Sequence, residues 1–201
     1  MIKRVFDIAV SAVALLLLLP VFGLIALFIK FDSPGPVFFK QCRIGRNFRR
    51  FWIYKFRTMI ADAPAQGGEL TVGADSRITR IGGWLRQFKL DELPQLFNII
   101  KGDMALVGPR PEVPRYVEMF RQDYEEILKL RPGLTDLASL KYRNEATLLA
   151  RADNPEAEYI AHLLPDKIRL AKEYRRRAGL LFDLRLTART VFTLLGQGGG
   201  S

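Results

Sequence analysis

The longest apolar run of the chain lies close to its N-terminus. Residues 8–29 carry no formal charge, and a continuous helix of this length would measure about 33 Å. Since a bilayer core is about 30 Å thick, the run predicts a membrane helix. Pro20 lies near its middle, where a proline removes one backbone hydrogen bond and bends a helix. We therefore expect residues 1–32 to be the membrane part of the chain.

Basic residues flank this run on both sides. Lys3 and Arg4 precede it, and six more basic residues follow: Lys30, Lys40, Arg43, Arg46, Arg49 and Arg50. Positive charge is retained on the cytoplasmic side, so two basic flanks fit a helix that is broken at Pro20 and returns through the same leaflet. From the residues alone, this re-entrant hairpin and a spanning helix are equally favoured. A cleaved signal peptide is disfavoured, because the run exceeds a typical signal core and lacks a small-residue cleavage pattern.

The rest of the pattern predicts a mostly α-helical domain with one short β-hairpin. Residues 37–41 and 49–57 have the composition of strands around a Gly-Arg-Asn turn at 45–47. Residues 61–75 are polar and contain several glycines, so we expect a mobile loop. Helices are predicted around 84–88, at 94–102, from 114 to about 131, and through the C-terminal third.

Helical spacing also predicts which side chains face the core. In the helix after Pro94 the expected buried stripe is Leu96, Phe97 and Ile100, and Gly102 ends that helix. In the last helix the stripe is Leu180, Leu184, Val191 and Leu195, with Arg185 and Arg189 outside it. A basic amphipathic helix can lie on a membrane, but we favour a core-facing stripe.

Charge is distributed unevenly over the 201 residues. The net charge is +10 and the sequence pI is about 10.0, yet residues 1–60 hold ten basic and two acidic side chains, and the remainder is nearly balanced. A basic segment beside a membrane helix points to anionic lipid or an anionic membrane-bound substrate. The single cysteine, Cys42, excludes a disulfide framework, and the single histidine, His162, excludes two-histidine metal ligation. The chain has no second apolar run of this length, so we do not expect a polytopic transporter or channel.

The sharpest acidic feature is the pair Asp91-Glu92, which stands just before a predicted helix start. Backbone N–H groups and the helix dipole stabilise negative charge there, which would keep Asp91 ionised to hold a divalent cation or to attack an electrophile. Acidic residues at helix starts are also ordinary capping groups. The pair alone is therefore weak support for catalysis.

Basic residues elsewhere strengthen the case for phosphate chemistry. Lys55 and Arg57 alternate along a predicted strand and share one face, which suits a phosphate clamp. Arg86 precedes the acidic pair by five residues. Arg110 lies between Pro109 and Pro111 in a stiff turn, where binding an anion costs little rotamer entropy. Carboxylates among several cations are what phosphoryl transfer requires.

Five segments resemble one known family. They are KRVFD at 3–7, YKFRTM at 54–59, LDELPQLFN at 90–98, KGDMALVGPRP at 101–111 and RPGLT at 131–135. The chain is similar to the bacterial monotopic phosphoglycosyl transferases, also called polyprenyl-phosphate sugar-phosphate transferases. The similarity covers residues 3–135 in order and is weaker beyond them.

This resemblance implies an activity and a location. It implies transfer of a sugar phosphate from a UDP-sugar to polyprenyl (undecaprenyl) phosphate with Mg²⁺, on the cytoplasmic face of the bacterial inner membrane. It implies that Asp91 is the nucleophile, that Glu92 assists with metal or proton, and that Lys55, Arg86 and Arg110 lie near phosphate. Residues 1–32 would be a re-entrant hairpin in one leaflet of membrane lipid, and residues 33–196 the catalytic domain. A homodimer is a further expectation, and no nucleic acid partner is expected.

Two departures from the family pattern are visible. Many members carry Ser-Pro at the helix break, where this chain has Leu19-Pro20. After Thr135 many members continue with Gly and a Gln-Val pair, where this chain has DLASLK at 136–141. Because the second departure falls near the expected sugar pocket, the sugar stays open. Residues 197–201 have the composition of an appended linker.

Two other functions compete with transfer. One is a non-enzymatic membrane-anchored module that binds anionic lipid or nucleic acid through its basic flank, with a steep salt dependence. The other is a nucleotide hydrolase on a simple anchor, which would need no lipid acceptor.

Overall fold

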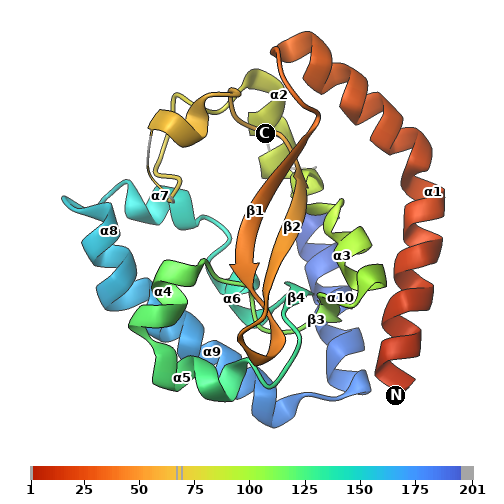
Figure 1. Cartoon of the computed structure of the whole chain (residues 1–201), viewed down its shortest axis with the longest axis vertical. Coiled ribbons are helices and arrows are strands. Elements are labelled where there is room, and N and C mark those ends of the chain that lie inside the picture. Colours follow the sequence, from red (N-terminus) through yellow and green to blue (C-terminus); the bar gives the residue numbers. More distant parts are fainter. Residues whose placement is uncertain (1, 67, 69, 196–201) are drawn as a thin grey trace.

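The computed structural model describes residues 2–66, 68 and 70–195. Helices surround a central antiparallel hairpin, and the long helix α1 (Ile2–Asp32) runs along one side (Figure 1). The predicted mostly α fold with a short β-hairpin is therefore confirmed. The linker predicted at 197–201 lies outside the described residues.

Helix α1 is long and apolar enough to cross a membrane by its length and composition. It is a single run of 31 residues with Pro20 inside it, and it bends around the rest of the molecule (Figure 1). The expectation that Pro20 divides this segment into two helices is therefore wrong. The proline removes one hydrogen bond from the ladder and the helix continues past it, which produces a bend.

One face of α1 packs on the folded domain along most of the helix. Leu15, Phe22, Ile25 and Ile29 are buried in a core shared with the hairpin and with helices α2 (Arg80–Gln87) and α3 (Gln95–Lys101). The opposite face is exposed and apolar, and includes Leu16, Leu17, Leu24 and Phe28. An apolar face of this size outside the protein core fits contact with lipid.

Both ends of α1 are tied to the same domain. Near its start, Lys3 donates to the carbonyl of Val107 at 3.2 Å and pairs with Asp183, while Arg4 donates to two carbonyls of the 100–104 segment. At its end, the Asp32 carboxylate accepts the Ile81 amide at 3.0 Å. The domain therefore holds α1 at two places separated by the length of the helix.

The hairpin consists of strands β1 (Phe38–Ile44) and β2 (Arg50–Phe56). They pair antiparallel from Phe38 opposite Phe56 to Ile44 opposite Arg50. The two predicted strands are confirmed, the second within one residue at each end, whereas the first continues three residues beyond its predicted end. The turn contains the short 3₁₀ helix η1 (Arg46–Phe48). Asn47 has a positive φ of 55° there, a conformation that asparagine tolerates better than most residues.

Helix α3 lies against the second edge of β2. The Asn98 amide accepts the Tyr54 backbone N–H at 3.1 Å and donates to the Trp52 carbonyl at 2.7 Å. Asn98 is fully buried, as is Ile99, while Phe97 and Ile100 are 46% and 37% exposed. The expected stripe is thus right for Leu96 and wrong for Phe97 and Ile100, because α3 turns its Asn98 side toward the hairpin.

A second, parallel strand pair was not foreseen from the sequence. Strand β3 (Ala105–Val107) pairs with β4 (Gly133–Thr135), each only three residues long. The two backbones approach so closely that a Cβ on Gly133 would stand 2.1 Å from the amide nitrogen of Gly108. Only glycine fits at such a contact, and strands this short leave little periodicity to detect.

The C-terminal half is helical, with a second apolar core between α4 (Pro114–Met119), α5 (Arg121–Ile127) and α9 (Leu164–Arg177). The single helix expected from residue 114 is two helices that meet at Phe120. The remaining elements are η2 (Ala63–Gln66), η3 (Leu90–Glu92), α6 (Leu137–Lys141), α7 (Glu145–Leu149), α8 (Pro155–Glu158), the π-helical turn η4 (Tyr159–Leu163) and α10 (Leu180–Leu195).

The expected core-facing stripe of α10 is wrong for three of its four residues, and the side chain of Leu195 is not described. Leu180, Leu184 and Val191 are exposed, and the helix instead buries Leu186 and Asp183. Asp183 pairs with Lys3 and accepts a hydrogen bond of 2.8 Å from the Tyr174 hydroxyl. This polar contact with α1 fixes the orientation of α10 and leaves the apolar stripe of α10 on the surface. Amphipathic helices that lie on membranes have such an exposed stripe.

Two adjacent glycines of α2 test this packing. A Cβ on Gly82 would stand 2.0 Å from the Thr58 carbonyl oxygen, whereas one on Gly83 would meet nothing nearer than 4.0 Å. We expect Gly82→Ala to lower the free energy of unfolding by about 2 kcal/mol or more, because backbone must shift. Gly83→Ala should raise it by about 0.5 kcal/mol through helix propensity. Thermal unfolding in detergent measures both, and an unchanged Gly82→Ala protein would contradict the contact.

Candidate active site

A cavity of about 950 Å³ opens beside the hairpin. Its wall includes the side chains that the sequence singled out: Lys55, Arg57, Arg86, Asp91, Glu92 and Arg110. They come from four separate segments of the chain. The fold therefore gathers the predicted residues around one space large enough for a small-molecule substrate.

Asp91 and Glu92 belong to the short 3₁₀ helix η3, directly ahead of α3. Lys89, just before it, has a left-handed backbone with φ of 57°, which turns the chain sharply after α2. The pair is buried, with 6% of Asp91 and 9% of Glu92 exposed. The predicted position of the pair just before a helix start is confirmed. Both residues line the cavity instead of lying on the open surface.

Glu92 is held by two cations from distant parts of the chain. Its Oε1 accepts from the Lys55 ammonium at 2.7 Å and from Arg110 Nη2 at 3.0 Å. Burial alone would raise the pKa of Glu92, but Arg110, Lys55 and Lys89 together hold this pKa well below its usual range. In return, Glu92 raises the pKa of Arg110. Glu92 is therefore a fixed anion.

Asp91 has a different environment. Its Oδ2 lies 4.0 Å from the Lys55 ammonium, and its buried Oδ1 has no hydrogen-bond partner within the described part of the chain. Burial raises the pKa of Asp91, while Lys55 opposes the shift and Glu92 adds to it. The expectation that backbone N–H groups stabilise this carboxylate is therefore not met. Asp91 is left as the carboxylate of the pair that its surroundings stabilise less.

Arg86 crosses from α2 to the loop that covers this side of the cavity. Its Nε donates to the Thr58 hydroxyl at 2.9 Å, and its Nη1 donates to the Thr71 hydroxyl at 3.1 Å. Burial lowers the pKa of Arg86, and the charge of Asp91 opposes this effect. Arg86 thus adds positive potential near the carboxylates without pairing directly with either of them.

Arg57 is placed differently from the expected phosphate clamp. It is buried, and its guanidinium donates to the carbonyls of Ile29, Ser33 and Pro34, with distances of 3.3, 2.7 and 2.6 Å. A cation near the last carbonyls of a helix also interacts favourably with the helix dipole. These contacts make Arg57 the residue that fixes the end of α1, and only Lys55 of the predicted clamp reaches the carboxylates.

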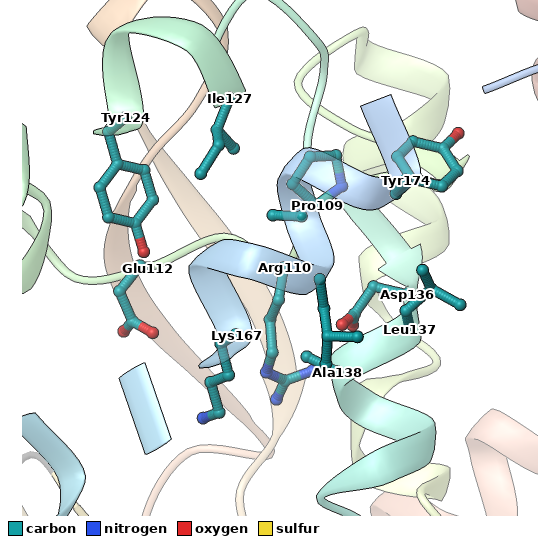
Figure 2. A pocket seen from close by; sticks show the side chains of 12 residues that line it. Pro109, Arg110, Glu112, Tyr124, Ile127, Asp136, Leu137, Ala138, Lys167 and Tyr174 are labelled. Atoms are coloured by element: carbon teal, nitrogen blue, oxygen red, sulfur yellow. The ribbon is translucent and has the colours of Figure 1, made fainter. Parts of the chain in front are cut away.

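Pro109 and Pro111 act through the backbone of the turn that carries Arg110. The Pro109 carbonyl accepts the Gly133 amide at 2.9 Å, and the Pro111 carbonyl accepts Arg43 Nη1 at 3.4 Å. Figure 2 shows Pro109 above Arg110, whose guanidinium extends down between Lys167 and Ala138. The prolines therefore fix where Arg110 leaves the chain, and their contact with substrate stays a prediction.

Three side chains with a bearing on the site were missed. Asn98 fixes α3 against β2, so that Lys55 and Glu92 meet. Asp136 and Ser139 lie behind Arg110, whose Nη1 donates to the Ser139 hydroxyl oxygen at 3.1 Å. Two local signals were available: Asn98 interrupts an apolar run, and residues 136–141 depart from the expected family pattern.

The carboxylates limit how a metal ion can bind. Within residues 2–66, 68 and 70–195, no group of three or more His, Cys, Asp and Glu side chains is arranged to hold one. Mg²⁺ usually keeps several waters and binds one or two carboxylates together with substrate phosphates. Asp91, with its unpartnered Oδ1, and Glu92 beside it fit this mode, whereas an all-protein metal cage does not.

Comparison with known proteins shows the family. The bacterial sugar transferase family model matches residues 1–197, so the chain belongs to the bacterial sugar transferases. It is 39% identical to the exopolysaccharide production protein PSS of Rhizobium leguminosarum bv. phaseoli, over 99% of this chain and 98% of that protein. The predicted family is confirmed.

Longer relatives carry more specific names. The chain is 37% identical to the undecaprenyl-phosphate glucose phosphotransferase of Komagataeibacter xylinus, over 94% of this chain and 35% of that protein. It is 34% identical to the UDP-glucose:undecaprenyl-phosphate glucose-1-phosphate transferase of Escherichia coli K12, over 96% of this chain and 40% of that protein. The chain therefore spans little more than a third of these two relatives.

The contrast between the two carboxylates predicts opposite effects on stability. A raised folded-state pKa means that the ionised Asp91 lowers stability at neutral pH, so Asp91→Asn should raise the free energy of unfolding by about 1 kcal/mol. Glu92→Gln should lower it by about 2 kcal/mol, because Lys55 and Arg110 lose their shared anion. Unfolding midpoints in chelator, which removes any metal contribution, measure both. Asp153→Asn, on the surface, is the neutral control, and shifts of equal sign would contradict the contrast.

Proposed function

We propose that the protein transfers a sugar 1-phosphate from a UDP-sugar to polyprenyl (undecaprenyl) phosphate, giving polyprenyl-diphosphate sugar and UMP. The observation that carries the proposal is the buried Asp91-Glu92 pair, with Lys55 and Arg110 fixed on Glu92 and with Asp91 only loosely paired. The names of the relatives support the same donor and acceptor. Among relatives, glucose and N-acetylgalactosamine are both named.

In this proposal Asp91 is the nucleophile. A carboxylate oxygen of Asp91 attacks the sugar-side phosphorus, the new O–P bond forms, and the bond to the bridging oxygen breaks with release of UMP. A phosphate oxygen of the polyprenyl phosphate then attacks the same phosphorus and displaces the carboxylate. Its raised pKa and unpartnered oxygen suit Asp91 to this role, since a poorly stabilised carboxylate is a stronger nucleophile.

The surrounding cations stabilise charge on the phosphates. Lys55 lies within reach of both carboxylates, so it can follow negative charge as it moves from Asp91 to the transferred phosphoryl group. Arg110 and Arg86 add positive charge on two sides of the cavity. Mg²⁺, held by Asp91 or Glu92 together with substrate phosphates, would neutralise part of the diphosphate charge.

The attachment of α1 supports insertion into one leaflet. A helix that spans a bilayer places its two ends about 30 Å apart on opposite sides of the hydrocarbon. Here Lys3 and Asp32, near the two ends, both bond to the same charged domain, which cannot lie on both sides at once. We infer that the helix bends into the cytoplasmic leaflet of the inner membrane and returns, so that the site meets the lipid phosphate at the surface.

Turnover tests the nucleophile. We expect Asp91→Asn to reduce UMP release by at least about 10³-fold, because a nucleophile is lost, and to abolish covalent labelling by a UDP-sugar labelled in the sugar. Purified protein, polyprenyl phosphate and a panel of UDP-sugars are assayed together. Asp153→Asn is the matched control. Full activity of Asp91→Asn contradicts the mechanism. Without polyprenyl phosphate the mechanism allows at most one UMP per protein molecule, so continued UMP release without it would favour a hydrolase.

Cysteine accessibility tests the topology. In a Cys42→Ser background, single cysteines replace Ile2, Pro34 and Arg176, of which the last is exposed at the end of α9. We expect an impermeant thiol reagent to label all three from the cytoplasmic side, because both ends of α1 contact the domain. Labelling of the Ile2 position from the opposite side would mean that α1 spans the membrane.

A further inference from the structure

Behind Arg110, two side chains at the start of α6 form a short polar chain. Asp136 is the N-cap of α6, and its Oδ1 accepts the Ser139 backbone N–H at 2.9 Å. Its second oxygen accepts the Ser139 hydroxyl proton. Having donated its proton, that hydroxyl directs a lone pair toward Arg110, whose Nη1 donates to it at 3.1 Å. Asp136 is buried, with 3% of the residue exposed.

Arg110 is therefore fixed at two different nitrogens. Nη1 bonds to Ser139 and Nη2 bonds to Glu92 at 3.0 Å. The charges alternate from Asp136 through Arg110 to Glu92, so each neighbour stabilises the next. About a third of the Arg110 side chain stays accessible at the cavity, which leaves part of the guanidinium free to meet a substrate.

Capping of α6 does not explain this arrangement by itself. An N-cap carboxylate needs only the backbone N–H of the third residue, and Asp136 already has it. The hydroxyl of Ser139 adds nothing to the cap, but it adds a fixed acceptor for Arg110.

We propose that Asp136 and Ser139 are positioning residues that hold Arg110 by Nη1, so that Nη2 can leave Glu92 and bind the diphosphate of the donor. This inference rests on the proposed function, since it names how one cation of that site is presented. An arginine anchored at one nitrogen loses little further rotamer freedom on binding. Without the anchor, only Glu92 would position the guanidinium. A small misplacement of a phosphate-binding group lowers the reaction rate strongly.

Kinetics with variants of Ser139 and Arg110 test the anchor. We expect Ser139→Ala to lower kcat about tenfold while KM for the UDP-sugar changes less than about threefold, because orientation is lost more than binding. Ser139→Thr keeps the hydroxyl and should restore kcat. In an Arg110→Lys background, Ser139→Ala should have no further effect, since lysine lacks the planar fork whose two nitrogens hold Ser139 and Glu92 separately. Asn154→Ala removes the side-chain cap of α8 and controls for a general loss of helix stability.

The outcomes separate the anchor from the proposed function. Wild-type kcat in Ser139→Ala, or an equal loss in the Arg110→Lys background, overturns the anchor while leaving sugar-phosphate transfer intact. If wild-type protein releases no UMP above Asp91→Asn, the proposed function fails instead. The coupling between Ser139 and Arg110 is then measured from the unfolding midpoints of four proteins: the wild type, Ser139→Ala, Arg110→Lys and the double variant. Strictly additive shifts of these midpoints overturn the anchor independently of turnover.

Discussion

The buried contact of Glu92 with Lys55 and Arg110 is the interaction on which the site depends. Each partner comes from a different structural unit: Lys55 from β2, Glu92 from η3, and Arg110 from the turn after β3. Removing Glu92 would leave two partly buried cations without their shared anion, which costs far more than the contact contributes. The carboxylate pair, the hairpin and the glycine-tight β3–β4 pair are therefore fixed relative to one another by charge. Asp91, beside this neutralised group, is left with an unpartnered oxygen.

Local signals in the sequence were sufficient for the elements and for most members of the site. The apolar run, the strand alternation and Pro94 with Gly102 are local patterns, and α1, the hairpin and α3 follow them closely. The acidic pair and the basic residues have distinctive chemistry, so Lys55, Arg86 and Arg110 were found from residue type and motif. Their meeting at one cavity follows from the resemblance and the fold, since no periodicity relates residues that far apart.

What the sequence could not predict depends on long-range partners. Arg57 has the residue type of a phosphate ligand, and only the position of the end of α1 assigns it to backbone carbonyls. The apolar stripe of α10 reads as core, but the contact of Asp183 with Lys3, 180 residues away, turns that stripe outward. The role of Asn98 likewise depends on an unpaired strand edge, which a single sequence does not reveal. In each case a buried polar contact overrides the local pattern.

The membrane helix and the site meet in one short segment of the chain. Lys55 reaches the carboxylates, Arg57 holds the end of α1, and the Thr58 hydroxyl accepts Arg86. Successive side chains of an extended segment point to opposite faces. Because the chain bends after β2, however, Lys55, Arg57 and Thr58 contact three different partners. Any shift of α1 in depth would therefore be transmitted through Arg57 to the strand end that carries Lys55. Under the proposed function, the position of α1 and the geometry around Asp91 are thus set together, which suits a soluble donor and an acceptor that stays in the membrane.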